Sequence, residues 1–140
     1  MKIILDTNVL SELMKPQGLV TVKDWVAMQP RENLFTTSIT QAEILYGIGI
    51  LPDGKRSQAL KAAAQEMFRE DFSGQILTFE STAAECFAEI ATHRRKTGKP
   101  ISQMDAQIAA ICLANNAKIA TRNVDDFQDC QIEIVNPWNP

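Results

Sequence analysis

Short apolar runs alternate with longer segments of helical periodicity along the whole of this 140-residue sequence. The first run, residues 2–5, carries three consecutive apolar side chains, a pattern typical of a strand in a parallel sheet covered on both faces. A chain in which such strands alternate with helices forms an α/β sandwich. We therefore predict a single domain over residues 1–140, with three layers and a mostly parallel central sheet of about five strands.

Cap and turn residues delimit the predicted elements. Gly74 and Gly98 each follow a helical segment and are expected to end it. Residues 38–41 and residues 102–105 have the spacing of capping boxes, which open helices. The strands are predicted at residues 2–5, 34–37, 75–79, 118–121 and 132–135, and the helices at residues 7–14, 21–28, 38–50, 55–72, 81–96 and 102–115.

Composition and charge limit the classes of protein to consider. The N-terminal apolar run meets Asp6 too early for a signal peptide, and no run approaches the roughly 20 residues of a membrane span. We therefore expect a cytoplasmic protein with no membrane partner. Three cysteines without a C-x-x-C pair predict neither a disulfide framework nor a thiolate metal site. The net charge of −3 is unusual for a nucleic-acid binder, which normally presents a basic face.

Acidic residues stand where ligands bind in parallel α/β sheets, beyond the carboxyl ends of the strands. The first follows the first predicted strand directly. Two others lie on the helix after the second strand and in the first turn of the helix before the fourth strand. A further polar group follows the fourth strand. In this order the candidates are Asp6, Glu43, Asp105, and the group of Asn123, Asp125 and Asp126.

Glu43 and Asp105 share an unusual environment on their predicted helices. Most residues three and four positions away are apolar in both cases, so each carboxylate is expected to face the protein. A buried carboxylate is paired, protonated or bound to a metal, because an isolated one is costly. Simpler roles stay open: Asp6 could cap the next helix, Asp105 could be the capping-box partner of Ser102, and Glu43 could reach solvent from the edge of its stripe.

Three converging carboxylates without a cationic partner would repel one another, and Mg²⁺ or Mn²⁺ would remove that repulsion. Sites made only of oxygen ligands suit these hard ions. Such a metal activates water and stabilises the charge that develops on a phosphodiester during cleavage. It would also allow an acidic protein to bind a polyanion.

Five segments, in order along the whole chain, resemble those of PIN-domain toxins of the VapC and FitB type. They are residues 4–8 (ILDTN), 37–47 (TSITQAEILYG), 105–110 (DAQIAA), 120–127 (ATRNVDDF) and 135–138 (VNPW). The resemblance implies an Mg²⁺-dependent endoribonuclease, a hydrolase, with Asp6, Glu43 and Asp105 as its metal-binding acids. Some members of the family carry an aspartate where Asn123 stands. The fourth catalytic acid is therefore absent or supplied by Asp125 or Asp126, which leaves a second metal undecided.

The resemblance also implies partners and accessory residues. Thr121 and Ser38 are candidates for ordering water or metal-bound groups, or for capping strand ends, and Arg122 is a candidate for contacting RNA or an antitoxin carboxylate. The family implies an RNA substrate and a small cognate antitoxin. We expect the antitoxin to insert a basic side chain among the acids and to lay an apolar segment along the groove. A homodimer, and a larger hetero-oligomer with the antitoxin, are implied by the family.

Other functions fit parts of the sequence. A phosphatase of the haloacid-dehalogenase type also starts with an aspartate after the first strand, but it needs a second acid two residues later, where Asn8 stands. A receiver-like signalling domain needs an adjacent pair of acids at the first strand and a lysine after the last one, and neither is present. A PIN-fold binding module without catalysis has the same sequence signature as the enzyme, and an RNA cleavage assay with Mg²⁺ or EDTA separates the two.

Overall fold

The computed structural model describes all 140 residues and contains one sheet of five strands in the order β3-β2-β1-β4-β5. Every pair of neighbouring strands is parallel. The strands are β1 (Ile3–Leu5), β2 (Leu34–Thr37), β3 (Ile76–Leu77), β4 (Lys118–Ala120) and β5 (Ile134–Val135). The α-helices are α1 (Thr7–Met14), α2 (Val20–Ala27), α3 (Ser38–Gly49), α4 (Lys55–Glu66), α5 (Ser81–Lys96) and α6 (Gln103–Ala114).

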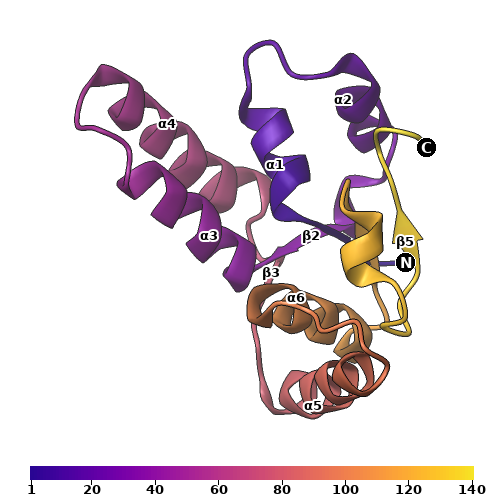
Figure 1. Ribbon diagram of the computed structural model, residues 1–140. Helices are drawn as coiled ribbons and strands as arrows, with labels where there is room; N and C mark the ends of the chain where they lie inside the picture. Colours follow the sequence, from indigo (N-terminus) through magenta and orange to yellow (C-terminus); the bar gives the residue numbers. More distant parts are fainter.

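The sheet has an apolar core on each face because successive residues of a strand point to opposite sides. Ile4 and Ile119 belong to the core that includes α5 and α6, whereas Ile3, Leu5 and Ala120 belong to the core on the other face. Figure 1 shows α5 and α6 on one side of the sheet, α1 and α2 on the other, and the α3–α4 pair extending away from the body. The predicted three-layer α/β sandwich is confirmed.

The boundaries of most elements agree with the prediction within two residues, and the exceptions have local causes. Helix α3 is capped by Thr37 and not by Ser38, because the Thr37 hydroxyl accepts the Thr40 N–H at 3.0 Å. The helix predicted over residues 55–72 ends its α-helical part at Glu66 and continues as a π-helical turn, η2 (Met67–Asp71). The third strand has only two residues instead of the five predicted.

Two short 3₁₀ helices were not predicted, η1 (Arg31–Asn33) and η3 (Val124–Phe127). The predicted stops are confirmed: Gly74 and Gly98 adopt left-handed backbone angles, with φ of 70° and 79°. None of the helices has the length and hydrophobicity that a membrane span requires.

The topology brings four segments to one edge of the sheet, because the carboxyl ends of parallel strands lie on the same side. Strand β1 runs through Asp6 directly into α1, and β2 runs through its last residue into α3. Strand β4 is followed by Thr121 and then by η3. Helix α6 packs beside α3 and η3. A functional site is therefore expected at this edge.

Candidate active site

Asp6 is the most buried acid of this edge, with 4% of its surface exposed. It is the N-cap of α1, and its Oδ1 accepts the Thr7 N–H at 2.9 Å. Its Oδ2 accepts the Thr121 hydroxyl at 2.8 Å and the Asn8 side-chain amide at 3.3 Å. Burial nevertheless raises the pKa of Asp6 to about 6, and the charges of Asp105 and Glu43 add to that rise. Asp6 thus caps the helix and also lies within electrostatic range of two other acids.

Thr121 orients its hydroxyl toward Asp6. Its Oγ1 is fully buried and accepts the Asn123 N–H at 3.0 Å and the Asn8 amide at 3.3 Å. A hydroxyl has two acceptor sites and one proton, so its proton is left for Asp6. Thr121 therefore donates its hydroxyl proton to the Asp6 carboxylate and has no free hydrogen-bonding position for water.

Asn8 joins the start of α1 to the segment after β4. Its amide nitrogen contacts Asp6 and Thr121, while its Oδ1 accepts the Arg122 N–H at 3.1 Å. The sequence alone predicts no such role for Asn8, which counts there only against a phosphatase. The signal available was its place in the ILDTN segment, two residues beyond the strand-end acid.

Glu43 is held in place by a residue of another helix. The Thr7 hydroxyl of α1 donates to Glu43 Oε1 at 2.6 Å, and the Thr7 and Thr40 hydroxyl oxygens lie 3.2 Å apart. Glu43 is half-buried on α3. The glutamate therefore contacts the protein at the sheet edge, as its apolar stripe predicted.

Asp105 lies in the first turn of α6, half-buried, with its N–H donating to the Ser102 hydroxyl at 3.2 Å. The capping role considered for this pair is therefore present. Burial raises the pKa of Asp105, and the charges of Asp126 and Glu43 raise it further. Asp105 thus lies within electrostatic range of acids from α3 and η3.

The segment after β4 presents its polar residues differently. Asp125, Asp126 and Asn123 are all exposed, but only Asp126 is among the charges that raise the pKa of Asp105. Asn123 is the residue before η3, and its backbone N–H is bound to Thr121. Of the three candidates for the fourth position, Asp126 has the electrostatic contact with the other acids.

Arg94 lies in the last turn of α5, within the basic run of residues 93–96, and is only 6% exposed. Its Nε donates to the carbonyl of Lys99 at 2.6 Å. Its Nη1 donates to the carbonyls of Asp126 and Gln128 at 2.9 and 3.0 Å. Arg94 also lowers the pKa of Asp105, although less than burial raises it. The neighbouring residues of the basic run remain exposed.

Arg122 and Ser38 lie at the border of the site. The Arg122 guanidinium carbon stands 5.5 Å from the centre of the Trp138 ring, a cation–π contact. Arg122 is also close enough to Glu12, at the end of α1, to lower the pKa of that acid together with the Leu19 N–H, which is the larger cause. Ser38 is half-buried as the first residue of α3.

The acids of this edge have no cationic partner at ion-pair distance, since none of Asp6, Glu43, Asp105 and Asp126 forms a salt bridge. No three acidic, histidine or cysteine side chains are close enough together to hold one ion alone. Mg²⁺ keeps several waters and is usually bound through one or two carboxylates. The donor set, oxygen-only and with one almost fully buried carboxylate, fits a hydrated ion of this kind.

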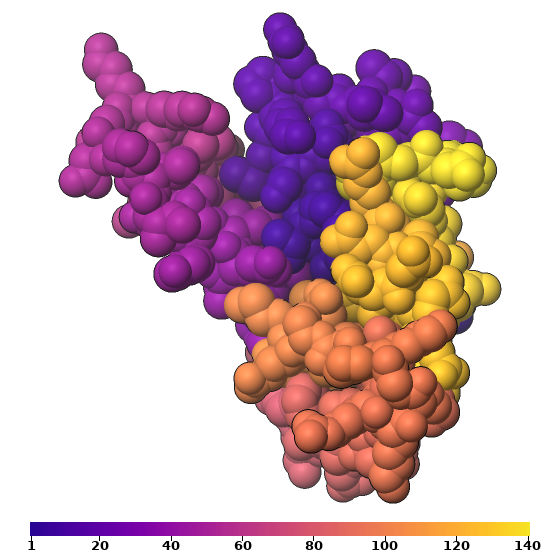
Figure 2. All heavy atoms as spheres, in the orientation of Figure 1, coloured from indigo at the N-terminus to yellow at the C-terminus, as the bar shows by residue number.

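Two neighbouring cavities lie along α1, and one of them reaches Glu43. The first, of about 620 Å³, lies between α1 and the α3–α4 pair and reaches Thr7 and Glu43. Figure 2 shows the surface hollowed between that pair and α1. The second, of about 530 Å³, lies between α1, α2 and η2, and the two share Met14 and Ala63.

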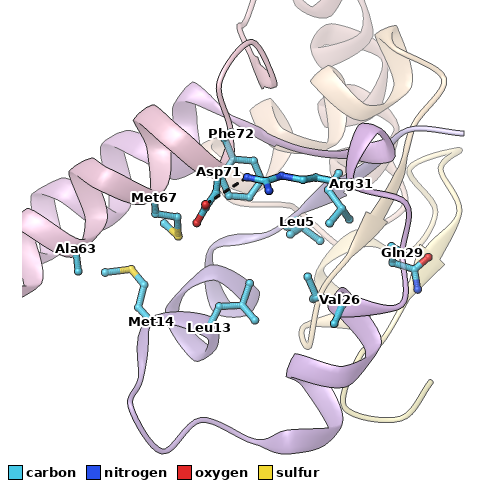
Figure 3. Close-up of a pocket in the computed structure, with 12 residues that line it drawn as sticks. Leu5, Leu13, Met14, Val26, Gln29, Arg31, Ala63, Met67, Asp71 and Phe72 are labelled. Atoms are coloured by element: carbon cyan, nitrogen blue, oxygen red, sulfur yellow. Dashed lines mark hydrogen bonds and ion pairs between the residues drawn. The ribbon is translucent and has the colours of Figure 1, made fainter.

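The second cavity is mostly apolar. Figure 3 shows Leu13 and Met14 of α1, Val26 of α2 and Met67 of η2 around it. One ion pair, between Arg31 and Asp71 at 3.5 Å, lies at its border. The two cavities adjoin at Met14 and Ala63 and form one track, which is apolar at one end and carries Glu43 together with Lys15 and Arg56 at the other.

Comparison with known proteins identifies the same family as the motifs. The family model of the PIN domain matches residues 3–131. The plasmid stability protein StbB of Pseudomonas syringae pv. tomato is 36% identical over 136 residues, which are 97% of this chain and 98% of that protein. The VapC ribonuclease Y4jK of Sinorhizobium fredii is 33% identical, with 99% of each chain covered.

The FitB toxin of Neisseria gonorrhoeae is 32% identical over 137 residues, which are 98% of this chain and 99% of the toxin. The crystal structure of FitAcB from the same organism superimposes with a TM-score of 0.92 and covers 99% of both chains. The likeness therefore extends over the full length in sequence and in fold.

Proposed function

Because this chain belongs to the PIN domain family, we propose that it is an Mg²⁺-dependent endoribonuclease, the toxin of a type II toxin–antitoxin pair. The observation that carries the proposal is the placement of Asp6, Glu43, Asp105 and Asp126 at one edge of the sheet, with Asp6 almost fully buried. Relatives named as a ribonuclease and as a toxin, aligned over their full length, support it.

We assign the metal chiefly to Asp6 and Asp105, with Glu43 as a third acid and Asp126 as the fourth catalytic acid. When bound, Mg²⁺ or Mn²⁺ supplies an activated water and stabilises the charge that develops on the phosphodiester. The chain's own residues prepare this arrangement. Thr121, Asn8 and the Thr7 N–H fix the Asp6 carboxylate, and the Thr7 hydroxyl fixes Glu43. Fixed ligand carboxylates lose little freedom when an ion binds.

A phosphatase and a binding module without catalysis are the two alternatives to a ribonuclease. The phosphatase reading is disfavoured because Asn8, which stands where the second acid would be needed, uses its amide to bind Asp6 and the Arg122 N–H. A PIN-fold binding module without catalysis keeps the same acids, so only chemistry distinguishes it from the enzyme.

The test is RNA cleavage by the purified chain. We expect cleavage with Mg²⁺, none with excess EDTA, and recovery when Mg²⁺ or Mn²⁺ is restored. Cleavage that continues unchanged in EDTA would contradict metal dependence. No cleavage of transfer, ribosomal or messenger RNA with either metal would favour the binding module.

We further propose a small antitoxin as the natural partner, as the FitB and VapC relationship suggests. The track of two cavities fits a segment with apolar side chains over Met14 and Ala63 and a basic side chain at its Glu43 end. Arginine would suit that end, since its planar fork binds carboxylates at two points. Replacing the antitoxin's groove arginine by alanine should release ribonuclease activity from the co-purified complex. Full inhibition by that variant would refute the arginine mechanism.

A further inference from the structure

Arg94 is a buried cation without a carboxylate partner. Its side chain is 6% exposed, and no acid lies at ion-pair distance from it. An unpaired buried charge is costly unless its protons are hydrogen-bonded. Here three backbone carbonyls take that role, and the Cys130 sulfur lies 3.5 Å from Nη1. The three hydrogen bonds offset the cost of burying the Arg94 charge, and they hold the segments that supply the carbonyls.

The three carbonyls belong to two different segments: one leads into the helix of Asp105, and the other contains Asp126. Lys99 lies in the connection that leads from α5 to the N-cap of α6, the helix of Asp105. Asp126 and Gln128 lie at the end of η3 and just after it. One rigid, planar guanidinium therefore spans both segments, and its fixed geometry sets how far apart they lie.

The second segment does not hold its shape by regular structure. After η3, Asp129 and Gln131 both have φ of 62°, left-handed angles that non-glycine residues adopt only when neighbouring contacts impose them. The exposed pair of His93 and Asp129, at 2.6 Å, adds a tie from the same turn of α5. The hydrogen bonds of the Arg94 guanidinium to this segment are buried, whereas the His93–Asp129 pair is exposed.

We infer that Arg94 is a positioning residue of the active site, whose guanidinium fork fixes the segment of Asp126 relative to the start of α6, where Asp105 lies. This inference rests on the proposed function for its catalytic consequence, although the positioning itself does not require RNA. It assigns Arg94 no contact with RNA or with the reacting atoms. The fork, and not the charge alone, is the property that matters.

The test compares Arg94→Lys with Arg95→Lys. Lysine keeps the charge at position 94 but carries its three donors on one nitrogen, so it cannot reproduce the separate positions of Nε and Nη1 that reach the two segments. Arg95 is the matched control, because it is exposed in the same helical turn and its side chain has no hydrogen-bond or ion-pair partner. Mn²⁺ binding is measured by calorimetry without RNA, and RNA cleavage is measured at saturating Mg²⁺.

For Arg94→Lys we expect Mn²⁺ affinity to fall about tenfold, as for other residues that orient metal-binding side chains. We expect kcat to fall while KM for RNA stays unchanged, and Arg95→Lys to behave as the wild type. Mn²⁺ affinity and kcat of Arg94→Lys within twofold of the wild type would overturn the inference.

Two further measurements test the positioning role of Arg94 without relying on RNA cleavage. In the metal-free protein, amide hydrogen exchange at Asp105 and Asp126 should accelerate in Arg94→Lys and not in Arg95→Lys. Unchanged exchange at both amides would overturn the inference even if the wild type cleaved no RNA, an outcome that would separately refute the proposed function. If Arg94→Lys does not fold, wild-type NMR decides: guanidinium protons of Arg94 that exchange as fast as those of Arg95 would contradict the fork.

Discussion

Asp6 accepts three hydrogen bonds at a position that almost no water reaches. The bonds favour its charged form, but burial outweighs them and raises its pKa to about 6 from an ordinary value of 3.8. The folded protein therefore binds a proton at Asp6 more tightly than the unfolded chain does. Residues that prepare a site for a cation commonly carry such a cost when the cation is absent.

The raised pKa of Asp6 predicts how the stability of the metal-free protein depends on pH. Between pH 4 and pH 6 the folded state holds a proton that the unfolded state has lost, so stability falls as pH rises through this window. By pH 7 the cost is about 3 kcal/mol. Urea unfolding in EDTA should show the wild type losing about 2 kcal/mol more than Asp6→Asn between pH 4 and pH 7, because the unfolded carboxyl is already more than half ionised at pH 4. Equal losses in the two proteins would contradict the burial argument.

At the scale of elements, periodicity and caps predicted the strands and helices because these patterns are local. Gly74 and Gly98 ended helices as expected, and α1 and α5 have the predicted bounds. The π-helical turn after Glu66 and the 3₁₀ helix η3 escaped prediction because packing against other elements, and not local preference, sets them. Both core clusters draw on these segments.

The acids of the candidate site could be predicted from the sequence, but their long-range hydrogen-bond partners could not. The place of Asp6 directly after a strand, and of Glu43 and Asp105 on helices near strand ends, predicted that these acids lie at one edge of a parallel sheet. The contacts of Asn8 with Thr121 and of Arg94 with Asp126 were not predictable, because these partners lie more than 100 and more than 30 residues away in the chain. A run of basic residues at the end of a helix gives no sign that one member turns inward.

The position of η3 leads to a ranking of its acids. Asp126 contributes to the raised pKa of Asp105, whereas Asp125 does not, so the two should differ in importance. We expect Asp126→Asn to lower kcat/KM for RNA cleavage by about tenfold or more and Asp125→Asn by less than about threefold. Both losses should be smaller than that of Asp6→Asn. A greater loss for Asp125→Asn than for Asp126→Asn would reverse the assignment of the fourth acid.

At the scale of the whole molecule, most of the cavity track proposed for the antitoxin lies apart from the acids proposed for catalysis. Ala63 of α4 lines both cavities, is exposed, and lies away from the sheet edge. A carboxylate at this position would lose its water against an apolar antitoxin segment. Ala63→Glu should weaken antitoxin binding by at least about tenfold, which corresponds to roughly 1.4 kcal/mol, while RNA cleavage by the free toxin is retained.

The neighbouring Ala62 offers the control for this experiment. It is exposed on the same helix and lines neither cavity, so Ala62→Glu should bind the antitoxin as the wild type does. Calorimetric titration of the antitoxin into each variant measures the difference. If Ala63→Glu binds as tightly as Ala62→Glu, the antitoxin segment does not follow the track.

The proposed function requires that the carboxylates at this sheet edge bind the divalent metal with which the protein cleaves RNA. The most direct measurement is kcat/KM for RNA cleavage at saturating Mg²⁺ by Asp6→Asn and Asp105→Asn, with urea unfolding of the same preparations as the control for folding. An amide keeps the shape of the carboxylate and removes the charge that a metal needs. We predict that both variants are folded and that their cleavage is at least about a thousandfold slower than that of the wild type, a loss of roughly 4 kcal/mol in transition-state stabilisation. Wild-type cleavage by either folded variant would refute the proposed metal site.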